Sequence, residues 1–139
     1  MATPPAPTAP RLKLAGRSAL VTGAARRVGA HIVRALHAAG AEVMIHCHRS
    51  LEPAQRLAEE LNLVRDGSAA VIAADLCDTA RLPQLITQTC ERFGGLDLLV
   101  NNASSFYPTP LGSITSAQWD DLIGTNLRAP LFLAQAAAH

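Results

Sequence analysis

Apolar residues in this chain follow two periods that alternate along the sequence. Four short runs are apolar almost throughout, at residues 18–22, 42–47, 69–73 and 96–100. Such runs are typical of strands buried on both faces of a sheet. Between them, apolar residues recur every three or four positions, as on one face of a helix. The alternation predicts an α/β fold with a doubly wound parallel sheet, helices on both faces, and ligand sites at the carboxyl ends of the strands.

The segments between the runs carry helix signals. The first helix is expected to bury an apolar stripe formed by Val28, Ile32, Leu36 and Ala39. Ser50 is a candidate N-cap for the second helix, which has Leu57 and Leu61 on one face, and Asp78 is a candidate cap for the third. Thr115-Ser-Ala-Gln118 matches a capping box that opens a last long helix.

Composition favours one well-packed domain and limits its partners. Of 139 residues, 49% are hydrophobic and 17% are charged, and the formal net charge is +1, so neither nucleic acid nor a membrane surface is an expected partner. The Pro- and Ala-rich residues 1–12 are expected to form a disordered tail before one domain at 13–139. The three cysteines show no C-x-x-C spacing, and a cytoplasmic location is expected.

The turn after the first strand has the features of a phosphate-binding loop. It reads Thr22-Gly-Ala-Ala-Arg-Arg-Val-Gly29, in which Gly23 permits a tight turn and Gly29 lets the helix pack close to the sheet. Backbone N–H groups at the helix start would then bind a pyrophosphate. The candidate residues are Gly23, Arg26, Arg27, Val28 and Gly29. An ordinary strand–helix turn is the alternative interpretation.

These residues resemble the short-chain dehydrogenase/reductase family, whose loop has the same T-G-x-x-x-x-x-G spacing. Arg27 stands where the family usually has a middle glycine, a departure that is similar to the pteridine reductases. The stretches His46–Ser50 and Asn101–Leu111 strengthen the resemblance, which runs from about Arg17 to the end of the chain. It implies a Rossmann-type fold and an NADP-dependent oxidoreductase.

The end of the second strand predicts which nicotinamide cofactor binds. An acidic residue there would bind a ribose 2′-hydroxyl and repel a 2′-phosphate, but this sequence has His48, Arg49 and Ser50. A guanidinium pairs with phosphate through two hydrogen bonds and a serine hydroxyl adds a donor, so NADPH is expected rather than NADH. In the alternative, Arg49 is a solvated surface residue and Ser50 only caps the next helix.

Two features near the strand ends have competing interpretations. The resemblance places Asp75, with its neighbour Leu76, at the adenine of the cofactor, whereas a cap or turn role is the alternative for Asp75. His46 and His48 lie two residues apart and would share one face of a strand. No carboxylate or thiol completes a ligand set on that face, so no metal is expected.

The loop after the fourth strand carries the candidate substrate residues. By resemblance, Asn102, Ala103 and Ser104 lie at the cofactor ribose, and Ser104 contacts both cofactor and substrate. Phe106 would stack on a flat pterin ring opposite the nicotinamide, and Arg27 would reach the cofactor phosphate and the pterin together. The alternative for Phe106 is an anchor in the core.

The catalytic groups are only partly present. Asn126 matches the family's catalytic asparagine, and Pro130 has no N–H to bond the carbonyl of Asn126, which is left to hold a water for proton relay. A simple proline kink is the alternative. The family's Tyr-x-x-x-Lys pair, which supplies the proton, is absent, because the only tyrosine, Tyr107, precedes Leu111 by four residues and the only lysine is Lys13.

Three functional hypotheses follow. The first is an NADPH-dependent pteridine reductase that transfers hydride to a pterin or dihydropterin, and the second is a short-chain carbonyl or alcohol oxidoreductase of other substrate. The third is a catalytically incomplete nucleotide-binding module. We expect either that the rest of the catalytic domain lies on a separate stretch or that the chain is truncated, inactive alone and incomplete at the C-terminal side of its sheet. The resemblance implies a homo-oligomer, a tetramer.

Overall fold

The computed structural model describes residues 13–139, and the tail expected at residues 1–12 lies outside this range. The strands are β1 (Ser18–Val21), β2 (Glu42–Cys47), β3 (Ala69–Ala73) and β4 (Leu98–Val100). The helices are α1 (Arg27–Ala38), α2 (Leu51–Val64), α3 (Leu82–Phe93), α4 (Ser116–Ile123) and α5 (Ala129–Ala137). A 3-10 turn, η1 (Thr79–Arg81), precedes α3, and a π-helical segment, η2 (Gly124–Arg128), joins α4 to α5. No helix in the described range has the length and apolar character needed to cross a membrane.

The four strands form one parallel sheet in the order β3-β2-β1-β4. Val21 of β1 lies opposite Ile45 of β2 on one side and Val100 of β4 on the other. The direction of strand addition therefore reverses at β1, and a parallel sheet binds ligands outside the carboxyl ends of its strands at such a switch point. The predicted doubly wound α/β fold is confirmed, and β4 is an edge strand of the described sheet.

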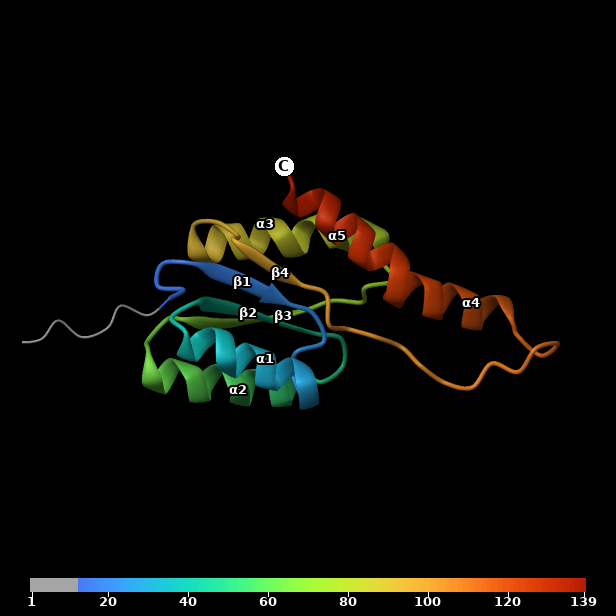
Figure 1. The fold of residues 1–139 in the computed structure, drawn as a ribbon, viewed down its shortest axis with the longest axis horizontal. Coiled ribbons are helices and arrows are strands. Elements are labelled where there is room, and N and C mark those ends of the chain that lie inside the picture. Colours follow the sequence, from blue (N-terminus) through green and yellow to red (C-terminus); the bar gives the residue numbers. More distant parts are fainter. Residues whose placement is uncertain (1–12) are drawn as a thin grey trace, which may run out of the picture.

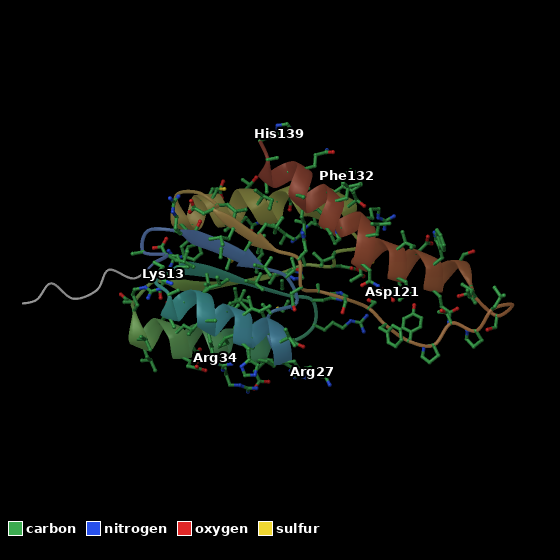
Figure 2. All side chains as sticks on the ribbon, viewed as in Figure 1. Lys13, Arg27, Arg34, Asp121, Phe132 and His139 are labelled. Atoms are coloured by element: carbon green, nitrogen blue, oxygen red, sulfur yellow. The ribbon has the colours of Figure 1, made fainter. Side chains whose placement is uncertain are left out.

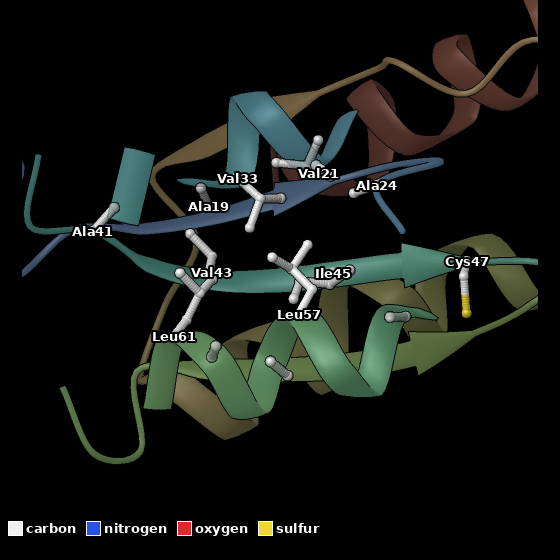
Figure 3. Packing of buried hydrophobic residues seen from close by; sticks show 14 residues of the cluster. Ala19, Val21, Ala24, Val33, Ala41, Val43, Ile45, Cys47, Leu57 and Leu61 are labelled. Carbon is white, nitrogen blue, oxygen red and sulfur yellow. The ribbon is translucent and has the colours of Figure 1, made fainter. Parts of the chain in front are cut away.

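Both faces of the sheet are apolar and covered by helices. Successive strand residues point to opposite faces, so Val21 and Ile45 pack against one pair of helices while Leu20 and Met44 pack against the other. The first cluster includes Val33 of α1 with Leu57 and Leu61 of α2 (Figure 3). The second includes Leu82, Leu85 and Ile86 of α3 with Ala129 and Leu133 of α5. Figure 1 shows α1 and α2 below the sheet and α3 and α5 above it.

The predicted apolar stripe of α1 is confirmed in part. Ile32 and Leu36 are partly buried and pack against the first cluster, whereas Val28 is exposed and Ala39 follows the end of the helix. The buried positions lie beside this stripe, at Gly29, Ala30, Val33 and His37. His37 is buried because its Nε2 forms a 2.7 Å hydrogen bond with Ser68 Oγ, a partner from a distant segment that helical periodicity does not reveal.

The predicted helix starts are confirmed at one capping motif and corrected at two others. Thr115 and Gln118 form both hydrogen bonds of a capping box at the start of α4. Ser50 occupies the N-cap position of α2, but its side chain makes no capping hydrogen bond. Asp78 precedes the η1 turn rather than α3, again without a side-chain cap. These two side chains thus remain available for contacts other than capping.

The predicted last long helix is interrupted by η2. Pro130 is an early residue of α5 and cannot donate to the carbonyl of Asn126. The N–H of Ala129 bonds the carbonyl of Gly124, five residues back, so the chain forms a wide π turn instead of a simple kink. Asn126 lies within this turn, where wide turns often coincide with functional sites.

Candidate functional site

A cavity of about 1070 Å³ opens at the carboxyl ends of the strands. Its walls come from the β1–α1 turn, the residues after β2 and β3, the loop after β4, and α4 with η2. In Figure 1 these segments meet to the right of the sheet. The volume lies at the upper end of the roughly 300–1,000 Å³ range of ligand sites. A large ligand is therefore expected at this place.

Glycine is required at two places in the β1–α1 turn. Gly23 has a φ of +60°, and a Cβ there would lie 2.8 Å from Ala103 Cα. A Cβ on Gly29 would lie 2.4 Å from the carbonyl oxygen of Gly23 and 2.6 Å from Asn102 Nδ2. The predicted roles of both glycines, a tight turn and close helix packing, agree with this geometry.

Arg27 adopts a backbone conformation that glycine favours. Its φ is +53°, the only positive value at a non-glycine residue within residues 13–139. A left-handed residue with a Cβ costs on the order of 1–2 kcal/mol, which explains why glycine suits this position in similar loops. The exposed Arg27 stands at the start of α1 (Figure 2). It is one of the residues that line the cavity, so the strained backbone lies at the candidate ligand site.

The start of α1 forms a positively polarised end of the cavity. Arg26, at the N-cap, makes no side-chain capping bond, and the first turn contains no acidic residue. The first N–H groups of the helix therefore keep their capacity for a ligand, and the helix dipole favours an anion there. The Arg26 and Arg27 side chains line the same end, whereas Asp120 and Asp121 line the α4 wall. This arrangement suits a ligand with a pyrophosphate.

His46 connects three segments of the site. Its Nδ1 accepts a 3.1 Å hydrogen bond from the N–H of Gly23, and its Nε2 lies 2.9 Å from the carbonyl oxygen of Ala74. The first bond requires an unprotonated Nδ1, so Nε2 donates to Ala74. Burial lowers the pKa of His46, His48 lowers it further, and the bond to Ala74 opposes both. No metal-ligating cluster of three side chains occurs within residues 13–139.

Thr22 and Asn102 join the ends of β1 and β4. The Thr22 hydroxyl accepts hydrogen bonds from the N–H groups of Asn102 at 3.1 Å and Ala103 at 3.0 Å. Asn102 Nδ2 donates to the carbonyls of Thr22 and Gly23, each at 3.0 Å. The side chain of Asn102 therefore stabilises the glycine turn, a role that its spacing in the sequence did not predict.

The residues after β2 and β3 form the side wall of the cavity. His48 and Arg49 are exposed and line it, and His48 Nε2 lies 4.0 Å from Asp75 Oδ2. Asp75 Oδ1 accepts from the N–H of Cys77 at 2.9 Å, an Asx turn that agrees with the alternative turn role. Its other oxygen faces the cavity wall near His48. Ser50 is half-buried and does not line the cavity.

Asn126 and Asp121 hold the loop after β4. Asn126 Oδ1 accepts from the N–H of Ser105 at 2.9 Å, and its Nδ2 donates to the Ser105 carbonyl at 2.8 Å. Asp121 accepts from the hydroxyls of Ser105 at 3.2 Å and Tyr107 at 3.0 Å. Partial burial and the Asp121 carboxylate raise the pKa of Tyr107. The Asn126 amide side chain thus clamps a backbone segment beside the cavity.

Most of the predicted residues meet at this one cavity. It is lined by Gly23, Arg26, Arg27, Val28, Gly29, His48, Arg49, Asp75, Leu76, Asn102, Ala103 and Ser104. Ser50, Phe106 and Asn126 do not line it. Phe106 is 91% exposed, so its alternative role as an anchor in the core is wrong. Lys13 lies at the opposite end of the sheet from Arg27 (Figure 2).

Several lining residues were missed by the sequence analysis. They are His46 as a lining residue, Cys77, Ser105, Asp120, Asp121, Thr125 and Arg128. Most of them come from α4, η2 or the segment after β3, which approach the cavity only through tertiary packing. The Nε atom of Arg128 is buried without a hydrogen-bond partner among the described residues, and its Nη2 donates to the Cys77 carbonyl at 3.4 Å.

The sheet order, the glycine turn and the cavity at the switch point define a protein with a Rossmann-type nucleotide-binding fold. Residues 17–139 match the family model described as short chain dehydrogenase, and the chain belongs to this family. The predicted family resemblance is confirmed.

The relatives that this chain resembles carry the names of different enzymes. It is 41% identical to "Pteridine reductase 1" of Leishmania tarentolae, with 87% of this chain and 53% of the relative covered. It is 35% identical to a "Sorbitol dehydrogenase" of Cereibacter sphaeroides, with 92% and 48% covered. A short chain dehydrogenase from Burkholderia cenocepacia J2315, solved in complex with NADP, superposes with a TM-score of 0.87 at 38% identity, covering 91% of this chain and 51% of that one. The chain spans about half the length of these relatives.

Proposed function

We propose that this chain forms the nucleotide-binding part of an NADPH-dependent reductase. The main support is the basic end of the cavity, where Arg26 and Arg27 lie at a start of α1 that has no side-chain cap. In addition, Arg49 follows β2 where an acidic residue would favour NADH. When bound, NADPH supplies a hydride. The similar chain from Burkholderia cenocepacia, which was solved with NADP, supports the choice of cofactor.

Different lining residues would contact different parts of the cofactor. The N–H groups at the start of α1, with Arg26 and Arg27, would bind the pyrophosphate. Arg49 and His48, which line the cavity, would bind the ribose 2′-phosphate through charge-assisted hydrogen bonds. The adjacent Ser50 lies outside the lining, but its hydroxyl makes no capping bond and would add a donor to the phosphate. The remaining lining residues would contact the adenine and the second ribose: Asp75, Leu76, Asn102, Ala103 and Ser104.

A pterin or dihydropterin is the proposed substrate. Ser104 lines the cavity, and the exposed Phe106 ring offers a free apolar face for a flat heterocycle. Arg27 at the turn would donate to acceptor atoms of both ligands. The 41% identity to a pteridine reductase supports this choice. The proton donor would come from residues outside these 139, and a tetramer is the proposed assembly.

A second candidate is a short-chain oxidoreductase for another alcohol or carbonyl, favoured by the 35% identity to a sorbitol dehydrogenase. Such an enzyme shares the glycine turn but does not require an aromatic ring at position 106 or Arg27. A third candidate is a nucleotide-binding module without turnover. The three candidates differ in what the complete gene product reduces.

The test is NADPH oxidation by the complete gene product with an oxidised pterin, with a ketose and with no substrate. We expect pterin-dependent oxidation. Phe106→Ala should raise KM for the pterin roughly tenfold by removing the stacking face, with little change in the affinity for NADPH. Leu111→Ala is the matched control, because Leu111 is 98% exposed on the same loop. Reduction of the ketose without reduction of the pterin would favour the second candidate, and oxidation of NADPH with neither substrate reduced or no oxidation at all would favour the third.

A further inference from the structure

In the loop after β4, the solvent exposure of the side chains alternates from one residue to the next. From Ala103 to Pro110, half-buried and exposed residues alternate without interruption. Ser105 and Tyr107 are half-buried, whereas Ser104 and Phe106 are exposed. Because successive side chains of an extended chain point to opposite sides, the segment has one face toward the protein and one face away from it. Of the residues proposed to contact substrate, the two that belong to this loop, Ser104 and Phe106, lie on the outward face.

The inward face is held by hydrogen bonds at three alternate residues, Ala103, Ser105 and Tyr107. The Ala103 N–H donates to Thr22 Oγ1 at 3.0 Å. Two positions on, the Ser105 backbone forms two hydrogen bonds with the Asn126 amide, at 2.9 and 2.8 Å. After two more residues, the Tyr107 hydroxyl donates to Asp121 Oδ2 at 3.0 Å. The described contacts thus hold every second residue and leave Ser104 and Phe106 free.

Asp121 is the group that binds both neighbours of Phe106. Its Oδ1 accepts from the Ser105 hydroxyl at 3.2 Å and from Thr125 at 3.5 Å, and its Oδ2 accepts from Tyr107. Hydrogen bonds to an ionised carboxylate are about twice as strong as neutral ones. Figure 2 shows Asp121 between α4 and the loop. One carboxylate therefore fixes the direction of the chain on both sides of the exposed ring.

We propose that Asp121 is a positioning residue for substrate, which sets Ser104 and Phe106 on one open face by binding Ser105 and Tyr107. The inference rests on the proposed function for the identity of the substrate. Phe106 lies two residues beyond Ser104, roughly 7 Å along an extended chain, a distance that one flat bicyclic ring spans. A substrate at the Ser104 side of the cavity would thus meet the Phe106 face only while the loop stays extended.

The first test measures the loop itself, in the complete gene product. Chymotrypsin cuts after aromatic residues but not before proline, so it can cleave the bond after Phe106 and not the bond between Tyr107 and Pro108. Mass spectrometry quantifies the cut after Phe106. Asp121→Ala should accelerate this cut at least fivefold. Asp120→Ala, which removes the adjacent exposed carboxylate with no described hydrogen bond to the loop, should not. Tyr107→Phe, which loses only the hydroxyl, should give an intermediate rate and keeps the test valid if Asp121→Ala does not fold. Equal rates in all four proteins would overturn the proposal.

The second test separates positioning from chemistry. Asp121→Ala should raise KM for the pterin by about the same factor as Phe106→Ala, with a smaller change in kcat and an unchanged affinity for NADPH. The double variant should be little worse than either single one, because both remove the same contact. Additive effects would show that Asp121 does not act through Phe106. If the wild type reduces no pterin while the cleavage pattern holds, the proposed substrate fails and the loop anchoring stands.

Discussion

At position 29 there is no room for a methyl group. A Cβ would lie 2.4 Å from one backbone oxygen and 2.7 Å from Ala24 Cα, and neither of these backbone atoms moves without shifting the glycine turn. We expect Gly29→Ala to lower the free energy of unfolding by about 1–3 kcal/mol and to abolish measurable NADPH binding. Urea unfolding and calorimetry measure the two effects.

The matched control is Gly95→Ala, because a Cβ on Gly95 would meet nothing within 4 Å. This variant should bind NADPH like the wild type. If Gly29→Ala were as stable as Gly95→Ala and still bound the cofactor, the turn would not be packed as described. Sequence spacing was sufficient to predict this glycine, because the need for close packing recurs in every loop of this kind.

At the scale of elements, His46 of β2 links the β1–α1 turn to the segment after β3. Burial lowers the pKa of its imidazole. A group with a depressed folded-state pKa stabilises the fold above its unfolded pKa, about 6.5, and loses that contribution as the pH falls through the lower value. Stability should therefore fall with acidification below about pH 6.5. Urea unfolding at stepped pH measures it.

His46→Asn isolates this residue, since Asn Oδ1 still accepts from the Gly23 N–H without titrating. The variant should lose part of the acid dependence and keep the remainder, because burial also lowers the pKa of His37. An unchanged pH profile would mean that His46 binds a proton as readily in the folded state as in the unfolded state, contrary to the hydrogen bonds described. The affinity for NADPH should also fall in the same acidic range, because the Gly23 N–H that bonds His46 belongs to the turn proposed to bind the cofactor.

The strands were easier to predict than the helix faces. The limits of β2 and β3 agree with the apolar runs to the residue, because a buried parallel strand needs apolar side chains on both faces. The predicted stripe of α1 omitted His37, whose burial depends on its hydrogen bond to Ser68, a pairing across 31 residues. At Asn126 the sequence predicted a free carbonyl that holds a water, with a proline kink as the alternative. It did not predict the π turn, because the shape of that turn depends on which carbonyl the Ala129 N–H reaches.

For the whole molecule, the sequence predicted the cavity residues of the glycine turn and the strand ends, but not those that α4 and η2 contribute. The glycine turn and the strand ends follow from local spacing, whereas Asp121, Thr125 and Arg128 reach the cavity through the packing of α4 and η2. No period or motif marks these three. Asp121 in particular acts through hydroxyls that lie 14 and 16 residues away in the chain.

Selection of NADPH by the cavity can be measured by calorimetry of the chain with NADPH and with NADH at matched salt. We expect NADPH to bind more tightly than NADH, and Arg49→Asp to weaken NADPH binding roughly 10- to 100-fold while sparing NADH, because the guanidinium contact with the 2′-phosphate is lost. Arg56→Asp, on the exposed surface of α2 and outside the cavity lining, is the control. Equal affinity of the folded wild-type chain for both cofactors, or an Arg49→Asp variant that still prefers NADPH, would show that the cavity does not select NADPH through Arg49.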